Sequence, residues 1–485
     1  MNLQKQKTMK FNSIYSLAAT FITAALVLGS LSACSNENLV TDTQNTTQAK
    51  TYTVSIPATM GSDTRAVTFD NSTTPPTAVS SFTTTDKIYV YNQTKEQMLT
   101  GYLTPTAAGK TCILTGSITG TIAAGDQLVL LYNLTYYSSD KSECFFYYDE
   151  QNGTQEGVVD GANAMVIASV DGNDLSSATA SFQNVQSMFR FQFKSGENAV
   201  SVKSVEITPY NNGIALCYFP LKTSEQYADL YELFGLYVKP TSPTSGPIYA
   251  ALCINESVGV GATLTFEVVD ADNKYYTTTK NVPAGGFVNG KYYYNAAPID
   301  LGAYVLQLVK PTLSRSDGGD TSELAEAWSG RCFMIYSPSK SGAGATGITM
   351  SMSGTCTGYW YRLKGDSGNT INMSNLTATY DETTYFVDSY NSLTINISGA
   401  NIIRCPNFDD CIFSDGDLKL NGNGTLTVTA NNEDDCGLWG EHNYNPGVLT
   451  NPSDLAAPGY TVTRSERTDN LDGTYTWTYT VTPNP

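Results

Sequence analysis

The stretch Leu393-Thr-Ile-Asn-Ile-Ser-Gly-Ala-Asn401 alternates apolar residues with Thr, Asn and Ser before a Gly and an Asn. Three more stretches share this texture and begin at Ile348, Ile371 and Leu418, so the four starts are 23, 22 and 25 residues apart. A repeat in the low twenties with this alternation is typical of a parallel β-helix, whose coils bury their apolar residues against one another. We therefore expect a short β-helix-like module over residues 345–458. A third β-sandwich stays open as an alternative, because strands of period two fit both folds.

Residues 459–485 carry the pattern of a hairpin. Two alternating runs, 460–464 and 475–481, flank a turn-rich segment at 469–473, and aromatic residues share one face of the second run. This hairpin is expected to cap the last coil, because the end coils of a solenoid need a cover. The alternative is a C-terminal donor strand used in assembly.

Upstream of the repeats, the sequence indicates two blocks of short β-strands. The chain holds 32 Tyr and 40 Gly, and alternating or apolar runs such as 88–91 and 263–269 are separated by turn residues. We place a first β-sandwich at 51–185, a second at 186–300, and a linker at 301–344, where Pro and Gly-Gly interrupt the pattern. The whole chain is therefore expected to be all-β.

The N-terminus has the form of an export signal. Three lysines precede an apolar run that ends in Leu31-Ser-Ala-Cys34, which indicates a secretory signal peptide over residues 1–33. The four closing residues resemble the bacterial lipobox. That resemblance implies that Cys34 becomes the lipidated first residue of a protein anchored in the cell outer membrane, since two or more acyl chains anchor stably at about 0.8 kcal/mol per buried CH₂. The polar residues 34–50 are expected to form a tether.

Three motifs between residues 51 and 300 resemble the fimbrillin, or type V pilin, superfamily. They are Thr64-Arg65-Ala66 soon after the lipobox, Phe82 followed by Asp86-Lys-Ile-Tyr-Val-Tyr91, and Phe287 followed by Gly290-Lys-Tyr-Tyr-Tyr294. The resemblance implies two tandem transthyretin-like β-sandwiches and export as a lipoprotein. It also implies proteolytic trimming between Arg65 and Ala66, which releases an N-terminal strand and opens a groove for a neighbouring subunit's donor strand. An ordinary loop arginine at position 65 is the alternative.

The titratable residues argue against an enzyme. The chain carries a formal charge of −18, or −21 once the leader with its three lysines is removed, so nucleic acid is a poor partner. His442 is the single histidine, which argues against histidine-based triads and multi-histidine metal sites. The acidic clusters have the spacing of solvated turns. We expect no catalytic residues, no metal site and no cofactor. Among the cysteines, Cys405 and Cys411 flank a turn and could form a disulfide.

Aromatic residues beside the repeats are the candidates for ligand contact. Residues 345–440 resemble the carbohydrate-binding β-helix domains of surface proteins, and Tyr359, Trp360, Tyr361 and Trp439 flank the coils. Sugar rings stack on such side chains, so these four residues are predicted to contact a polysaccharide or host glycan. Packing of the same rings in the core is the alternative.

These observations favour a non-enzymatic, lipid-anchored cell-surface protein. We expect a fimbrillin-like subunit that is pilus-associated or adhesive, joined to other pilin subunits by strand exchange and located at the outer membrane or in a fimbrium. A glycan-binding surface lipoprotein that does not polymerise is the alternative.

Overall fold

The computed structural model describes most of the chain from residue 49 to residue 485. The segments outside the described part are 1–48, 61–67, 71–76, 80, 133–144, 148–149, 163–165, 173–174, 176, 185, 210–217, 221–234, 254–260, 288–290, 295–296, 320–325, 328–329, 338–346, 366, 433–436 and 441–450. The signal peptide, Cys34, Arg65, Ala66 and His442 therefore lie outside the described residues. Among the residues that the structure does describe, no helix is long and apolar enough to cross a bilayer.

The first block is one eight-stranded sheet that closes on itself, because β4 pairs with both β6 and β8. Its strands are β1 (Lys50–Met60), β4 (Ile88–Asn92), β5 (Gln97–Met98), β6 (Thr100–Pro105), β7 (Thr111–Gly120), β8 (Gln127–Tyr132), β11 (Val166–Asp171) and β12 (Ala180–Asn184). Alternation in β1 turns Val54, Ile56 and Ala58 inward, where they join a buried cluster that includes Phe82 and Phe182. A short pair, β2 (Thr68–Asp70) and β3 (Thr77–Val79), stands apart from this sheet.

The second block packs one large sheet against two small ones. The large sheet runs β10 (Glu150–Gln151), β18 (Leu236–Val238), β16 (Val202–Pro209), β20 (Thr263–Asp270), β21 (Lys274–Asn281) and β24 (Leu306–Gln307). The small sheets are β19 (Ile248–Cys253), β13 (Gln186–Phe191) and β22 (Tyr292–Tyr294), and β15 (Asn198–Ala199), β14 (Phe193–Ser195) and β23 (Ile299–Asp300). Phe191 and Phe193 contact Phe266 in the core between them, and Phe189 stacks on Phe191 in the same cluster. The helix α2 (Gln155–Ala162) and the pair β9 (Phe145–Tyr147) and β17 (Tyr218–Pro220) lie outside these sheets.

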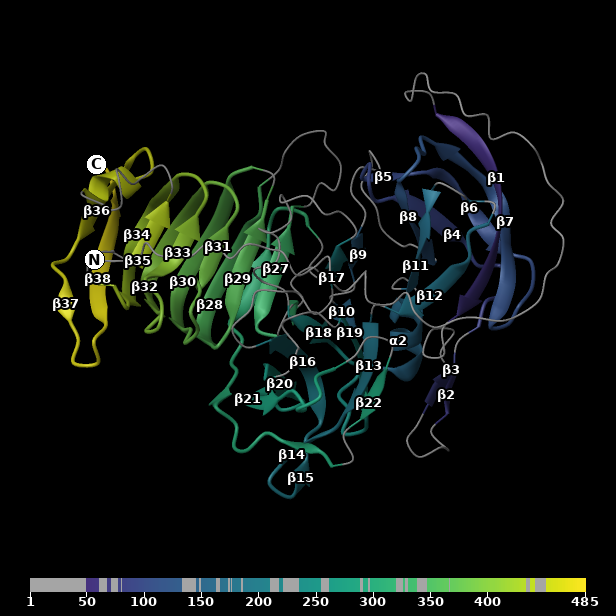
Figure 1. Ribbon diagram of the computed structural model, residues 1–485. Helices are drawn as coiled ribbons and strands as arrows, with labels where there is room; N and C mark the ends of the chain where they lie inside the picture. Colours follow the sequence, from purple (N-terminus) through teal and green to yellow (C-terminus); the bar gives the residue numbers. More distant parts are fainter. Residues whose placement is uncertain are drawn as a thin grey trace. The chain divides into compact units, whose positions relative to one another are not determined.

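The C-terminal block is a solenoid of stacked parallel strands, as the repeat predicted (Figure 1). One sheet contains β25 (Thr312–Arg315), β28 (Thr349–Thr357), β30 (Asn369–Thr379), β32 (Leu393–Arg404) and β34 (Leu418–Ala430). The other contains β26 (Glu326–Ala327), β27 (Cys332–Tyr336), β29 (Trp360–Lys364), β31 (Val387–Ser389), β33 (Asp410–Ser414) and β35 (Gly437–Gly440). In the first sheet, β28, β30, β32 and β34 pair in parallel, and in the second sheet β27, β29, β31, β33 and β35 do the same. This pairing excludes a third antiparallel sandwich.

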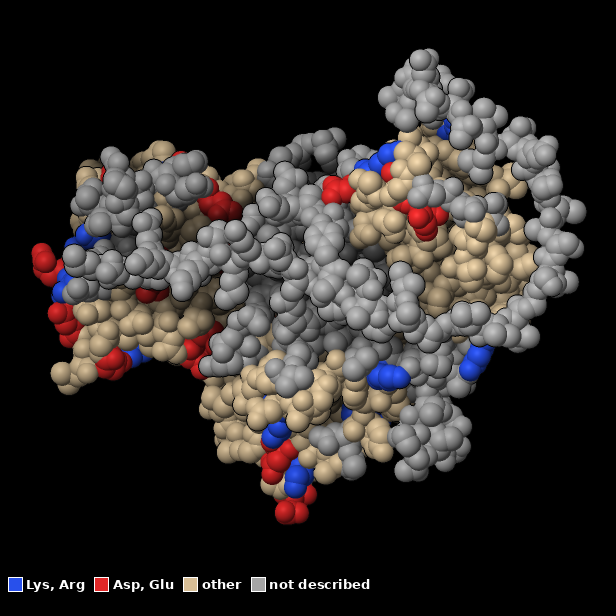
Figure 2. Space-filling view, in the orientation of Figure 1, with Lys and Arg blue, Asp and Glu red and all other residues tan. Residues whose placement is uncertain are grey.

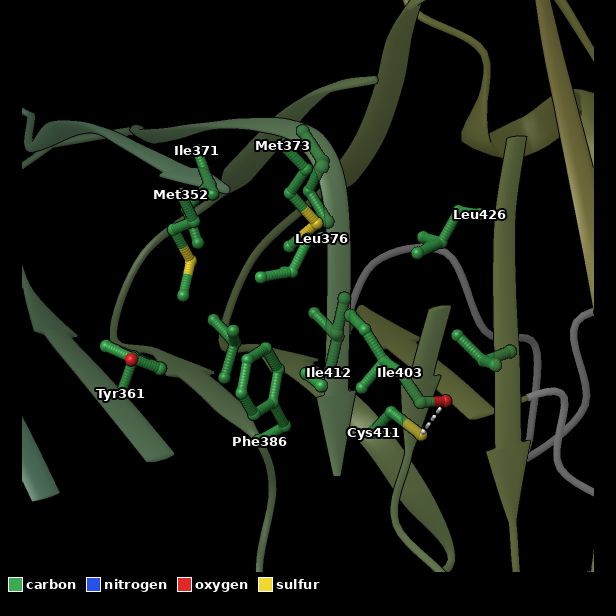
Figure 3. Packing of buried hydrophobic residues seen from close by; sticks show 14 of the residues in the cluster. Met352, Tyr361, Ile371, Met373, Leu376, Phe386, Ile403, Cys411, Ile412 and Leu426 are labelled. Carbon is green, nitrogen blue, oxygen red and sulfur yellow. Dashed lines mark hydrogen bonds between the residues drawn. The ribbon is translucent and has the colours of Figure 1, made fainter. Parts of the chain in front are cut away.

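Successive coils of the solenoid stack with their equivalent residues in register. Ile371 pairs with Ile395, and Ile395 pairs with Leu420, so equivalent apolar residues of successive coils stack directly. Figure 3 shows Met373 and Leu376 of the first sheet above Phe386 and Ile412, and all four belong to one continuous buried cluster. Each coil therefore depends on its neighbours for burial.

The segment 301–344, predicted as a linker, contains four short strands among its described residues. Strand β24 pairs with β21 of the second block, and β25 pairs with β28 of the solenoid. Strands β26 and β27 are the first two strands of the second solenoid sheet. The apolar run Cys-Phe-Met-Ile at 332–335 is buried, which a simple linker would not allow.

The C-terminal hairpin ends the first solenoid sheet. Strand β38 (Tyr475–Pro483) pairs antiparallel with β34 and with β36 (Tyr460–Arg464), while β37 (Thr468–Asp469) pairs with β38. Leu455, in the short 3₁₀ helix η7 (Pro452–Leu455), is buried in the same core. The hairpin thus occupies the position expected of a cap.

Candidate functional site

Two of the four predicted glycan-contact residues are wrong as surface contacts. Tyr359 and Tyr361 are fully buried, and their ring centres lie 5.4 and 5.2 Å from that of Phe333. The Tyr361 hydroxyl lies 3.6 Å from the Cys356 thiol, and burial raises the pKa of Tyr361 well above its ordinary value. In β29, inward Tyr361 and Leu363 alternate with outward residues, and Tyr359 is buried just before the strand. Neither tyrosine therefore offers a ring face to a ligand.

The two tryptophans lie on the outward side of the second solenoid sheet. Trp360 and Trp439 are each partly exposed. Trp439 follows the buried Leu438 in β35 and pairs in register with Phe413 of β33. Trp360 lies on β29 directly before buried Tyr361. These positions keep the two tryptophans as candidates for ligand contact.

A group of outward side chains surrounds Arg362 on the same sheet, and we call it the aromatic–cation patch. Its members are Tyr336, Trp360, Arg362, Lys364 and Tyr390. The Arg362 guanidinium lies 5.0 Å from the ring centre of Trp360 and 5.5 Å from that of Tyr390. The Lys364 ammonium lies 5.1 Å from the ring centre of Tyr390 and 5.9 Å from that of Tyr336. Each cation is thus flanked by two aromatic rings, an arrangement that fixes its position.

One buried carboxylate, that of Asp388, pairs with a cation of the patch. The Nε of Arg362 donates to Asp388 at 2.7 Å, and the Asp388 side chain is only 6% exposed. Burial raises the pKa of Asp388, although the neighbouring Arg362 opposes this rise. Burial and then the charge of Arg362 lower the pKa of Lys364. Tyr336 and Tyr390 are 46% and 41% exposed, so these two tyrosines of the patch face solvent.

Sequence reasoning missed Tyr336, Arg362, Lys364 and Tyr390. They belong to β27, to β29 and to the residue after β31, and stacking of the coils brings them together. One signal was available in the sequence. In the run Trp-Tyr-Arg-Leu-Lys at 360–364, two cations alternate with two apolar residues. This alternation indicates that the side of the strand with the cations faces outward.

Strand β1 is a second candidate site, because it lies inside the first sheet directly before the segment that contains Arg65. It pairs antiparallel with β7 along ten positions, from Lys50 to Thr59, and parallel with β12 at its C-terminal end. Four of its side chains point into the core, namely Val54, Ile56, Ala58 and Met60. Loss of this strand would leave unpaired backbone groups on two neighbours and an open apolar groove.

The described residues offer little for catalysis. No group of three or more His, Cys, Asp or Glu among them could hold a metal ion. The thiols of Cys112 and Cys356 have pKa values raised to about 11 by burial, so they are protonated at neutral pH and poor nucleophiles. Cys405 and Cys411 are both buried as free thiols, rather than joined in the disulfide considered from the sequence.

The fold and the patch describe an all-β protein with a C-terminal solenoid that presents an aromatic face. No family model matches the sequence, and no curated protein does. Four chains of solved structures match, and two of them are described here. One is the tip fimbrial protein Mfa3 from Porphyromonas gingivalis, with 8% identity, a TM-score of 0.25, and coverage of 50% of this chain and 86% of that one. The other is a candidate cell adhesion protein from Bacteroides uniformis, with 16% identity, a TM-score of 0.24, and coverage of 50% and 92%. Similarity at these scores carries no functional weight.

Proposed function

We propose that this chain is a non-enzymatic cell-surface subunit of the pilus-associated or adhesin kind, anchored in the outer membrane by lipid on Cys34. The observation that carries the proposal is the place of β1. This strand forms a central part of its sheet and ends at Met60, five residues before Arg65. A protease that cuts after Arg65 would separate β1 from the body of the protein.

Removal of β1 supports assembly by strand exchange. An incoming strand from another subunit would bond to the backbone of β7 and β12, and its alternate side chains would fill the positions of Val54, Ile56 and Ala58. The four inward apolar side chains of β1 define the register that such a donor must match. If Arg65 is not cut, β1 stays in place and the protein remains a single anchored subunit.

The mature N-terminus tests this proposal. Mass spectrometry of protein taken from its own membranes should find diacylated Cys34 on the anchored form, and an N-terminus at Ala66 on any assembled form. An Arg65→Ala variant should lose the second species and the detergent-resistant ladders, whereas the surface variant Lys110→Ala should keep both. An unlipidated protein without ladders would contradict the proposal.

Glycan binding without polymerisation is the second candidate. It is favoured by the exposed rings of Tyr336 and Tyr390 beside partly exposed Trp360. Aromatic side chains with one free face stack on sugar rings. Retention of the protein on polysaccharide gels, with no ladders, would support this candidate over the first.

A further inference from the structure

The aromatic–cation patch lies in two rows that cross the coils. In one row, Met334 pairs with Arg362, and Arg362 pairs with Asp388. In the other row, Tyr336 pairs with Lys364, and the Tyr390 ring lies 5.1 Å from the Lys364 ammonium. Met334 and Asp388 are buried, so the first row presents only Arg362 at the surface. The second row presents Tyr336, Lys364 and Tyr390 at the strand spacing of about 4.8 Å. An extended polymer that crosses the strands would meet one row position per coil.

The patch brings two cations together on one strand, each beside aromatic rings. The whole protein has 45 Asp and Glu against 27 Lys and Arg, and both acidic and basic groups are visible on the described surface in Figure 2. The six strands of this sheet carry two basic residues, Arg362 and Lys364, both on β29, and three acidic residues, Glu326, Asp388 and Asp410. Asp388, the carboxylate paired with Arg362, is less exposed than its partner, at 6% against 15%. An approaching ligand therefore meets cations and rings before it meets the carboxylate.

We propose that the aromatic–cation patch binds an anionic polysaccharide whose sugars carry carboxylate groups. The aromatic rings would stack on the apolar faces of the sugars, and Arg362 and Lys364 would bind the carboxylates by charge-assisted hydrogen bonds. The rings that flank each cation hold it in place, so little side-chain freedom is lost on binding. This inference rests on the glycan binding proposed above and adds the charge class of the ligand.

Binding to hyaluronan, which alternates a uronate with a neutral sugar, tests the proposal, and dextran serves as the neutral comparison. The full mature protein should be retarded in gels that contain hyaluronan but not in gels that contain dextran, and the retardation should decrease as salt rises. Lys364→Gln and Tyr390→Ala should each weaken binding roughly tenfold, the effect of losing one charged hydrogen bond or one stacking face. Lys364→Arg should keep most of the affinity.

Two control variants outside the patch show whether a loss of binding is specific to the patch. Lys419→Gln removes a cation from the other solenoid sheet, and Tyr102→Ala removes a comparably exposed ring from the first block, so both should bind like the unmodified protein. Thermal unfolding of each variant separates lost binding from lost folding. Equal retardation by dextran would overturn the charge class and leave glycan binding standing. Failure to bind either polymer would overturn both, and unchanged binding by folded Lys364→Gln and Tyr390→Ala would overturn this site.

Discussion

The Arg331 guanidinium lies 4.3 Å from the ring centre of Tyr275, so a cation at the start of β27 covers an aromatic ring of the second sandwich. The same group donates from Nε to the Gly358 carbonyl at 2.7 Å, and from its terminal nitrogens to Glu382 and Asp381 at 2.6 and 2.8 Å. Its side chain is almost completely buried. Arg331 thus contacts both the second sandwich and neighbouring coils of the solenoid.

Replacing Arg331 with Met should destabilise the protein by about 2 kcal/mol, because hydrogen bonds to a charged group are lost while Asp381 and Glu382 can return to water. Urea unfolding followed by circular dichroism measures this loss. The exposed Arg467, paired with Asp469, provides the control, and Arg467→Met should leave the midpoint unchanged. Equal midpoints for both variants would show that the Arg331 contacts do not join the modules.

Stacking in the solenoid core predicts a strong contrast between two isoleucines of β32. Ile395 is fully buried between Ile371 and Leu420, so Ile395→Ala should cost about 2–5 kcal/mol in the free energy of unfolding. Ile402 is 44% exposed on the same strand, and Ile402→Ala should change stability by less than about 0.5 kcal/mol. Chemical denaturation of both variants gives the comparison, and similar losses would contradict the register.

Asn401 joins three coils through its buried amide. Its Oδ1 accepts from the Leu376 amide at 3.0 Å, and its Nδ2 donates to the carbonyls of Ser398 and Thr425 at 3.1 and 3.3 Å. Asn401→Ala leaves these backbone groups without that partner and should cost about 1–3 kcal/mol. Thermal unfolding measures this loss, and Asn423→Ala, at an exposed position of β34, is the matched control. A midpoint shift as small as that of the control would refute the role of Asn401.

The carboxyl group of Glu267 predicts a pH dependence of stability. Burial, and next the charge of Glu382, raise the pKa of Glu267 in the folded protein. The folded state therefore binds more protons than the unfolded state between the ordinary Glu pKa of about 4.3 and the raised value, so the contribution of Glu267 to stability falls as pH rises through this range. Glu267→Gln removes that loss.

The difference in stability between Glu267→Gln and the unmodified protein should therefore grow from about pH 4 to about pH 7 in favour of the variant. Urea midpoints at several pH values measure this difference. Asp317 has a lowered pKa, so its contribution to stability is lost at low pH, and it acts equally in both proteins. A difference that does not change with pH would show that Glu267 titrates normally.

Some of the fold could be predicted from the sequence, because long strands display their alternation. The four runs that begin at Ile348, Ile371, Leu393 and Leu418 are the strands β28, β30, β32 and β34, with starts within two residues of those predicted. The partner strands of each coil are only three to five residues long after β27, and one of them, Val-Asp-Ser at 387–389, has no readable pattern. Their positions follow from stacking rather than from local sequence.

The candidate site was harder to predict for a related reason. Trp360 was found because tryptophan is conspicuous, but the burial of its neighbours Tyr359 and Tyr361 depends on which side of β29 faces the core. Tyr336 and Tyr390 lie 54 residues apart in the chain and come together around Lys364 only when three coils have stacked. Contacts of that kind leave no local signature.

The antiparallel pairing of β38 with β34 limits how a module of this type can lengthen. A new parallel coil needs a free strand edge of the same direction, and the hairpin already occupies that edge of β34 with a strand of the opposite direction. Additional coils can therefore enter by duplication of an internal coil but not by extension of the C-terminus. Because the patch lies on β27, β29 and the residue after β31, coils inserted beyond β31 would move the C-terminal end outward and leave the patch intact.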